Sequence, residues 1–265
     1  APEAAEDIGS AEDEAAEGRE TRAFGMWIKS LGVGEVQHLM DDVRDGQLIL
    51  HTMDHVQPGS VDWNKVHKPK VKEGVTRPVP VFRRIENCSY AVLLGKGHFR
   101  FSLVGIDGRD IHNGNEKLTK ALIWQLMRLH LMSFLSTLRA GAKDGALTDA
   151  AMVKWANETV KKTGSILTMR DCSDKSLSSG AFLIELLAAV EPRCINRAHV
   201  TAGATAEDRE LNARYAISAA RKVGLSLFLL WEDIVEVRPK MILSFVATVM
   251  AHAVKPAAKP AQDVQ

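Results

Sequence analysis

An internal repeat constrains the fold of this chain more than any other feature of its sequence. The block GQLIL at residues 46–50 is echoed by GAFLI at residues 180–184, and NCSYA at residues 87–91 is echoed by NARYA at residues 212–216. Further matched pairs are Trp27 with Trp155, Asp110-Ile111 with Asp233-Ile234, and Lys117-Leu118 with Lys240-Met241. The offsets run from 123 to 134 residues. This spacing indicates a duplicated domain and not a short-period solenoid.

The repeat and the local composition predict two domains with a linker and two tails. Residues 140–148 are dominated by Gly, Ala, Lys and Asp, as is typical of a linker. We therefore expect the domains to span residues 20–139 and 149–254. Residues 1–19 carry seven acids and one Arg, which predicts a disordered acidic linker because the segment has little apolar surface to bury. Residues 255–265 are expected to form a tail.

The composition is that of an ordinary globular protein, with 46% hydrophobic and 25% charged residues. No apolar run approaches the ~20 residues of a membrane span, and the acidic N-terminus does not resemble a signal peptide. Cys88, Cys172 and Cys194 are odd in number and widely spaced, without a CxxC motif. We therefore expect reduced thiols and a cytoplasmic location.

Apolar periodicity predicts a helical fold, with helices near residues 21–31, 46–55, 81–95, 118–131 and 239–250. The helix over residues 118–131 (LTKALIWQLMRLHL) has apolar side chains on nearly every side. Such a helix is either buried within its own domain or partly covered by a partner. Lys120, Trp124 and Arg128 are spaced four apart and so lie along one side. An aromatic side chain flanked by two cations is typical of binding hot spots.

Motifs for catalysis and metal binding are missing from the sequence. His51 and His55 have the spacing of two zinc ligands, but the Glu of HExxH and a third ligand are absent. No Ser/His/Asp order, paired-carboxylate motif or Gly-rich phosphate loop has a suitable context. We therefore predict a protein that is not an enzyme and has no metal site or cofactor.

A basic loop interrupted by prolines is expected over residues 67–80. Its cations and their neighbours could contact phosphates or an acidic protein surface, although such runs are usually only solvated. The loop lacks the interleaved aromatic side chains that stack on bases. We expect neither nucleic acid nor a membrane as a partner.

Four blocks resemble the calponin-homology domains of the fimbrin (plastin) family: VDWNKV at 61–66, ENCSYAVLLG at 86–95, FSLVGIDGRDI at 101–111 and LTKALIWQLMR at 118–128. Their order and spacing match that family. The sequence departs from it within residues 71–81 and after Arg128, where Leu129 replaces a second basic residue. The resemblance implies an all-α fold of two tandem calponin-homology domains packed as a compact pair.

The resemblance also implies an actin-filament-binding module of a filament-crosslinking (bundling) protein. In this family the first domain makes most of the contact, and the second supports or gates it. The family uses the exposed sides of its first and central helices. On this chain the corresponding candidates are Arg22, Met26, Lys29, Lys117, Lys120, Trp124 and Arg128. Residues 20–139 carry 17 cations and 12 acids, a net charge of +5, which suits an acidic filament.

The expected partner is filamentous actin, bound by a monomer in the cytoplasmic actin cytoskeleton. An alternative partner such as tubulin or a signalling scaffold stays open, because fold alone does not fix the partner. The single pair of domains and the acidic segment before it suit the C-terminal one of two such units. Trp124 is either a core residue or lies at the seam between the domains, where a cation–π contact with Lys240 would bias a closed state.

Overall fold

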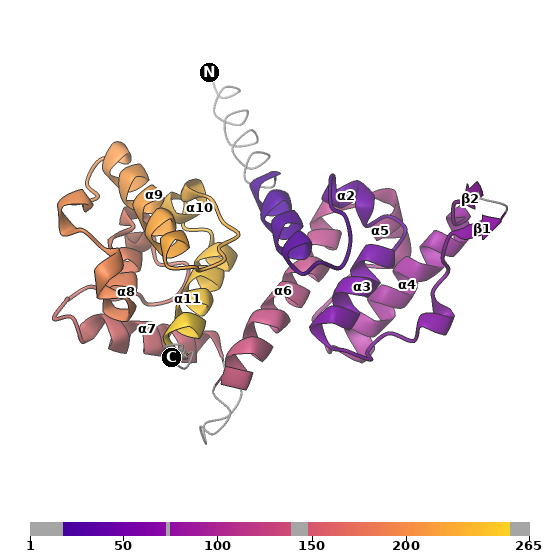
Figure 1. Cartoon of the computed structure of the whole chain (residues 1–265), viewed down its shortest axis with the longest axis horizontal. Helices are drawn as coiled ribbons and strands as arrows, with labels where there is room; N and C mark the ends of the chain where they lie inside the picture. The colour runs from indigo at the N-terminus through magenta and orange to yellow at the C-terminus, as the bar shows by residue number, and fades with distance from the viewer. Residues whose placement is uncertain (1–17, 73–74, 139–147, 255–265) are drawn as a thin grey trace, which may run out of the picture. The chain divides into compact units, whose positions relative to one another are not determined.

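A computed structural model describes residues 18–72, 75–138 and 148–254 of the chain. The chain divides into two compact units, residues 1–130 and 131–265, and each is considered by itself. Both are built mainly of helices (Figure 1). Within the described ranges, no helix has the length and apolarity to cross a membrane. The compact packing of the two domains stays a prediction.

The first unit begins with a helix whose described part covers residues 18–30. The elements that follow it are α2 (Leu39–Asp42), α3 (Gln47–Val56), the 3-10 helix η1 (Trp63–Lys65), β1 (Lys70–Lys72), β2 (Val75–Arg77), α4 (Val81–Gly97), α5 (Gly108–Asn113) and α6 (Glu116–Leu138).

The second unit repeats this order without strands in its described part. Its elements are α7 (Asp149–Lys161), η2 (Lys175–Ser179), α8 (Ala181–Val190), η3 (Pro192–Cys194), η4 (Arg197–His199), α9 (Ala206–Lys222), α10 (Trp231–Val235) and α11 (Pro239–Val254). The predicted helices at 46–55, 81–95, 118–131 and 239–250 correspond to α3, α4, α6 and α11.

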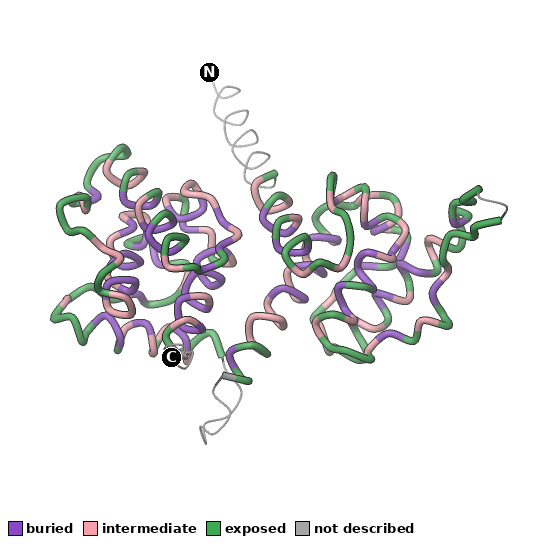
Figure 2. The backbone as a smooth tube through the Cα atoms, viewed as in Figure 1, coloured by how far each residue is buried: buried purple, intermediate pink, exposed green. Residues whose placement is uncertain are grey.

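The core of the first unit includes buried side chains of the helix over residues 18–30, α3, α4 and α6, and Figure 2 shows buried stretches on several helices of this unit. Phe24, Trp27 and Ile28 are almost fully buried on that helix, as their spacing predicts. Four residues of α6, Leu122, Ile123, Leu126 and Met127, are at most 1% exposed. Of the two alternatives for this helix, burial within its own domain holds for these four side chains.

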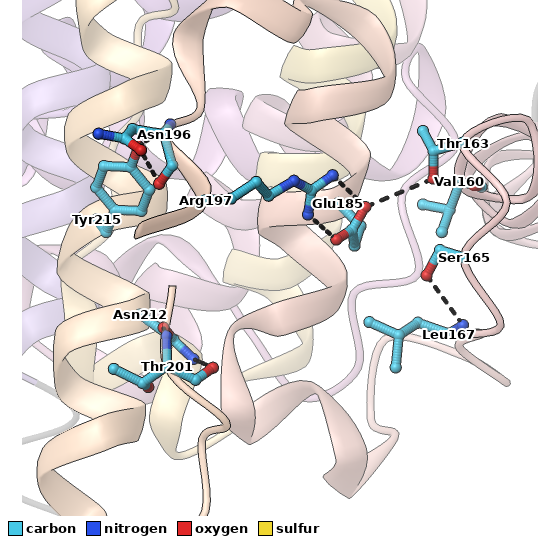
Figure 3. A network of polar contacts seen from close by, with 10 residues as sticks. All are labelled: Val160, Thr163, Ser165, Leu167, Glu185, Asn196, Arg197, Thr201, Asn212 and Tyr215. Carbon is cyan, nitrogen blue, oxygen red and sulfur yellow. Dashed lines mark hydrogen bonds and ion pairs between the residues drawn. The ribbon is translucent and has the colours of Figure 1, made fainter. Parts of the chain in front are cut away.

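The internal repeat reappears in the polar contacts of the two units. In the second unit, the Asn196 backbone N–H donates to the Tyr215 hydroxyl, and the Thr201 backbone N–H donates to the Asn212 side chain (Figure 3). In the first unit the Asp62 backbone N–H donates to the hydroxyl of Tyr90, which lies 125 residues before Tyr215. A bidentate ion pair between Arg197 and Glu185 adds to the second network (Figure 3).

The basic segment expected as a loop contains a short antiparallel hairpin instead. Lys70 pairs with Arg77, and Val71 with Thr76. All six strand residues are exposed, so the hairpin adds nothing to the core. The fold is thus mainly helical, with one two-stranded sheet in the described residues.

The predicted segment boundaries fall largely on residues outside the described ranges. Residues 18 and 19, expected in the acidic tail, are helical. Residues 1–17, 139–147 and 255–265 lie outside the described residues. Thr148 caps α7 by accepting a hydrogen bond from the backbone N–H of Ala151.

All three cysteines are free thiols, and burial raises the pKa of the Cys88 thiol to about 12.

Candidate functional site

The helix over residues 18–30 has one buried face and one exposed stripe. Arg22, Met26 and Lys29 are all exposed. Spacings of four and three residues place them in one row along the helix. The opposite face carries the buried Phe24 and Ile28, so core packing fixes the direction in which the stripe points. The structure therefore brings these three predicted residues together.

A groove of about 470 Å³ runs beside this stripe. The residues that line it come from the helix and from the segment that leads into α2, and they include Arg22, Met26, Lys29, Val36, Gln37 and His38. Asp42 holds that segment in place, because its carboxylate accepts hydrogen bonds from the backbone N–H groups of Gln37 and His38 at 2.8 and 2.9 Å. The groove thus has a fixed far wall.

The candidates on α6 do not share one exposed side. Lys117 is exposed in the first turn, but Lys120 is only 3% exposed and lies 3.7 Å from the Glu116 carboxylate. The expectation that Lys120 is exposed is wrong. Lys120 is in a row with Ile123 and Met127, at spacings of three and seven residues, and both of these are buried.

Trp124 and Arg128 are half-buried on α6. The Trp124 ring stacks on Phe24 of the first helix, with centroids 6.5 Å apart and an interplanar angle of 26°. Trp124 therefore joins the two helices that carry the candidate residues. Lys240 is half-buried at the second position of α11, and its pairing with Trp124 stays a prediction.

A second contact joins the same two helices. The indole N–H of Trp27 donates a hydrogen bond to His130 Nδ1 at 3.2 Å. Burial, and then the neighbouring His55, lower the pKa of His130. Sequence reasoning missed this contact, because the two residues are 103 positions apart.

The arrangement is suited to binding. It combines exposed cations, a methionine and a groove wall of Val36, Gln37 and His38, which the sequence did not single out. Across the described ranges, no group of three or more His, Cys, Asp or Glu side chains could hold a metal ion. Exposed cations beside apolar groups suit an acidic macromolecular surface.

Comparison with known proteins shows the family to which this chain belongs. The sequence family of the calponin homology (CH) domain matches residues 19–131 and again residues 147–255. The chain belongs to the calponin homology family. Its two matched segments coincide with the two copies of the internal repeat, so the calponin homology domains are arranged in tandem.

The tandem pair is of the fimbrin and plastin type. The chain is 45% identical to fimbrin-5 of Arabidopsis thaliana over 239 residues, covering 90% of this chain and 34% of the relative. It is 40% identical to plastin-3 of Homo sapiens over 242 residues, covering 90% of this chain and 37% of the relative. The chain therefore spans about a third of the length of these curated relatives.

A solved structure agrees with the fold. The crystal structure of the actin-crosslinking core of Schizosaccharomyces pombe fimbrin matches with a TM-score of 0.78 and 40% sequence identity. The match covers 89% of this chain and 48% of that chain. The fold class is thereby confirmed as two calponin homology domains. Membership of this family also agrees with the prediction that the chain is not an enzyme.

Proposed function

We propose that this chain is the actin-filament-binding module of a filament-crosslinking protein. The first domain makes most of the contact, and the second supports or gates it. The observation that carries the proposal is the exposed stripe of Arg22, Met26 and Lys29 beside its groove, on a calponin homology domain. The related fimbrin structure is that of an actin-crosslinking core.

The charge of the two domains supports this division of roles. Residues 20–139 have a net charge of +5, whereas residues 140–254 hold 14 cations against 13 acids. Cations on the first domain would face an acidic filament, and Met26 would add an apolar contact. Lys117 and Arg128 extend the cationic surface onto α6, while the buried Lys120 acts indirectly by positioning the start of that helix.

Co-sedimentation of the whole chain with actin filaments tests the proposal. We expect binding that weakens between about 50 and 200 mM salt, because exposed charge pairs are screened. Microtubules are the matched alternative polymer and are expected to leave the chain in the supernatant. Sedimentation with microtubules but not with actin filaments would support the alternative calponin homology pair that binds tubulin.

The setting of the module is part of the same proposal. We expect a monomer in the cytoplasm, on the actin cytoskeleton, that supplies one of the two filament sites of a longer crosslinking protein. The chain covers about a third of its fimbrin and plastin relatives, which leaves room for a second such unit.

A further inference from the structure

The bond between Trp27 and His130 depends on the protonation state of the imidazole. Nδ1 accepts the indole N–H at 3.2 Å, so in this geometry Nδ1 carries no proton and Nε2 carries the only one. Trp27 is 1% exposed, and its N–H therefore has little access to water. Loss of the acceptor would leave a buried donor without a partner, which is costly.

The groups around His130 disfavour its protonation. The His55 ring from α3 lies 6.4 Å away, edge to face. The neighbouring Asp54 carboxylate accepts instead from the backbone of Gly59 and Val61 and from the Trp63 indole. These hydrogen bonds of the Asp54 carboxylate thus go to groups other than His130.

The charged residues that lie nearest to Trp27 and His130 along these two helices are cations. Lys29 is exposed on the first helix, and Arg128 is half-buried on α6 itself. Burial and the proximity of His55 lower the pKa of His130 below its usual 6.5. The neutral imidazole is therefore the form that the folded domain favours.

The fold does not require this pair of imidazoles. At the offset of 123 that relates Lys117 to Lys240, His130 corresponds to Ala253. At the offset of 134 that relates Gly46 to Gly180, His55 corresponds to Ala189. The second domain thus has alanines at both positions. The imidazole pair belongs to the domain that we propose makes most of the filament contact.

We propose that His130 is a pH-sensitive link between the first helix and α6, and that its protonation weakens filament binding. A proton from solvent on Nδ1 turns the acceptor into a donor that opposes the Trp27 N–H, which loosens the helix carrying Arg22, Met26 and Lys29. The regulatory part rests on the proposed function. The loss of the bond itself does not.

The direction of the pH effect follows from the lowered pKa. A group whose pKa is lower in the folded than in the unfolded state contributes stability that is complete above the unfolded value. Stability from His130 is therefore full above about pH 6.5 and is lost as the pH falls toward its lower folded pKa. Filament binding should weaken in the same window.

The first experiment follows the ring itself in the full chain by ¹H–¹⁵N NMR. We expect the Nε2–H tautomer at about pH 7.5, and the Trp27 indole resonance should move together with the titration of His130. The variant Trp27→Phe, which keeps an aromatic ring and removes the donor, should raise the pKa of His130. A Trp27 resonance that stays fixed while His130 titrates would overturn the link.

The second experiment compares filament affinity at about pH 7.5 and at the lower pH at which the NMR titration finds His130 protonated. We expect wild-type affinity to fall roughly three- to ten-fold, as for the loss of one hydrogen bond. His130→Gln, whose amide oxygen can accept but does not titrate, should lose most of this dependence. His98→Gln, an exposed histidine of the same domain, is the matched control and should behave as wild type.

The two proposals fail in different ways. Equal pH dependence in wild type and His130→Gln would overturn the regulatory role, even if both bind filaments. No filament binding at either pH would overturn the proposed function and with it the regulatory role, while the NMR titration would still decide whether the link exists.

Discussion

The side-chain amides of Asn87 and Asn212, 125 positions apart, make the same three hydrogen bonds in the two domains. The Asn87 amide nitrogen donates to the carbonyls of Asp45 and His67 at 3.0 and 2.9 Å. The Asn212 amide nitrogen donates to the carbonyls of Ser179 and Thr201 at 2.8 and 3.1 Å. The two amide oxygens accept the backbone N–H groups of His67 and Thr201, at 2.8 and 2.9 Å respectively. Both side chains are fully buried, so Asn87 and Asn212 form equivalent buried polar anchors in the two domains.

Replacing either anchor should destabilise its own domain. Asn87→Ala and Asn212→Ala each leave several buried backbone groups without partners, so we expect a loss of about 2–4 kcal/mol in the free energy of unfolding. Urea unfolding of the full chain measures it. Asn113→Ala, at an exposed position of α5, is the control. A loss below about 0.5 kcal/mol in both anchor variants would contradict the role given to the amides.

Three glycines, two of which lie beside these anchors, should tolerate alanine in a defined order. Gly46, Gly180 and Gly59 all have positive φ, at 77°, 70° and 81°, so alanine costs roughly 1–2 kcal/mol at each. A Cβ on Gly59 meets no atom within 4 Å, a Cβ on Gly180 comes within 3.0 Å of Asn212 Cβ, and a Cβ on Gly46 comes within 2.7 Å of a backbone nitrogen. Stability should therefore fall least for Gly59→Ala and most for Gly46→Ala. Equal losses would show that backbone strain alone matters.

Much of the fold could be predicted from the sequence because apolar spacing and the repeat are local signals. The residues of the candidate filament contact were harder to predict from the sequence. Lys120 belongs to a row with Trp124 and Arg128 and also to a row with Ile123 and Met127. On a helix with apolar residues all round, spacing alone does not tell which row faces the core. The Trp27–His130 bond joins distant positions and depends on how the helices pack.

The basic hairpin was missed for a different reason. Its strands are three residues long and fully exposed, so they carry no buried face. Prolines on either side favoured a loop. Backbone pairing, which side-chain patterning does not report, makes this element.

The chain by itself should bind filaments without bundling them. Crosslinking needs two filament sites held apart, and the exposed cationic stripe occurs on the first domain. We expect the chain to sediment with filaments at high centrifugal speed and to leave them in the supernatant at low speed. Filaments that pellet at low speed with a monomeric chain would contradict this.

Lys240 should restrain the module if it pairs with Trp124 between the domains. A cation over an indole face is worth ~0.5–2 kcal/mol, so Lys240→Glu should raise filament affinity several-fold by favouring an open state. Lys222→Glu, on an exposed position of α9, makes the same charge change elsewhere in the second domain. Unchanged filament affinity in Lys240→Glu would show that Lys240 does not restrain filament binding.

The most direct test of the central claim is the filament affinity of Arg22→Glu combined with Lys29→Glu, measured by co-sedimentation at low salt. Lys175→Glu combined with Arg193→Glu is the matched control, with the same change in charge at exposed positions of the second domain. We expect a loss of at least ten-fold for the first pair, about 1.4 kcal/mol or more, and a near-normal affinity for the control. Wild-type affinity in Arg22→Glu plus Lys29→Glu would contradict the assignment of this stripe as the filament contact.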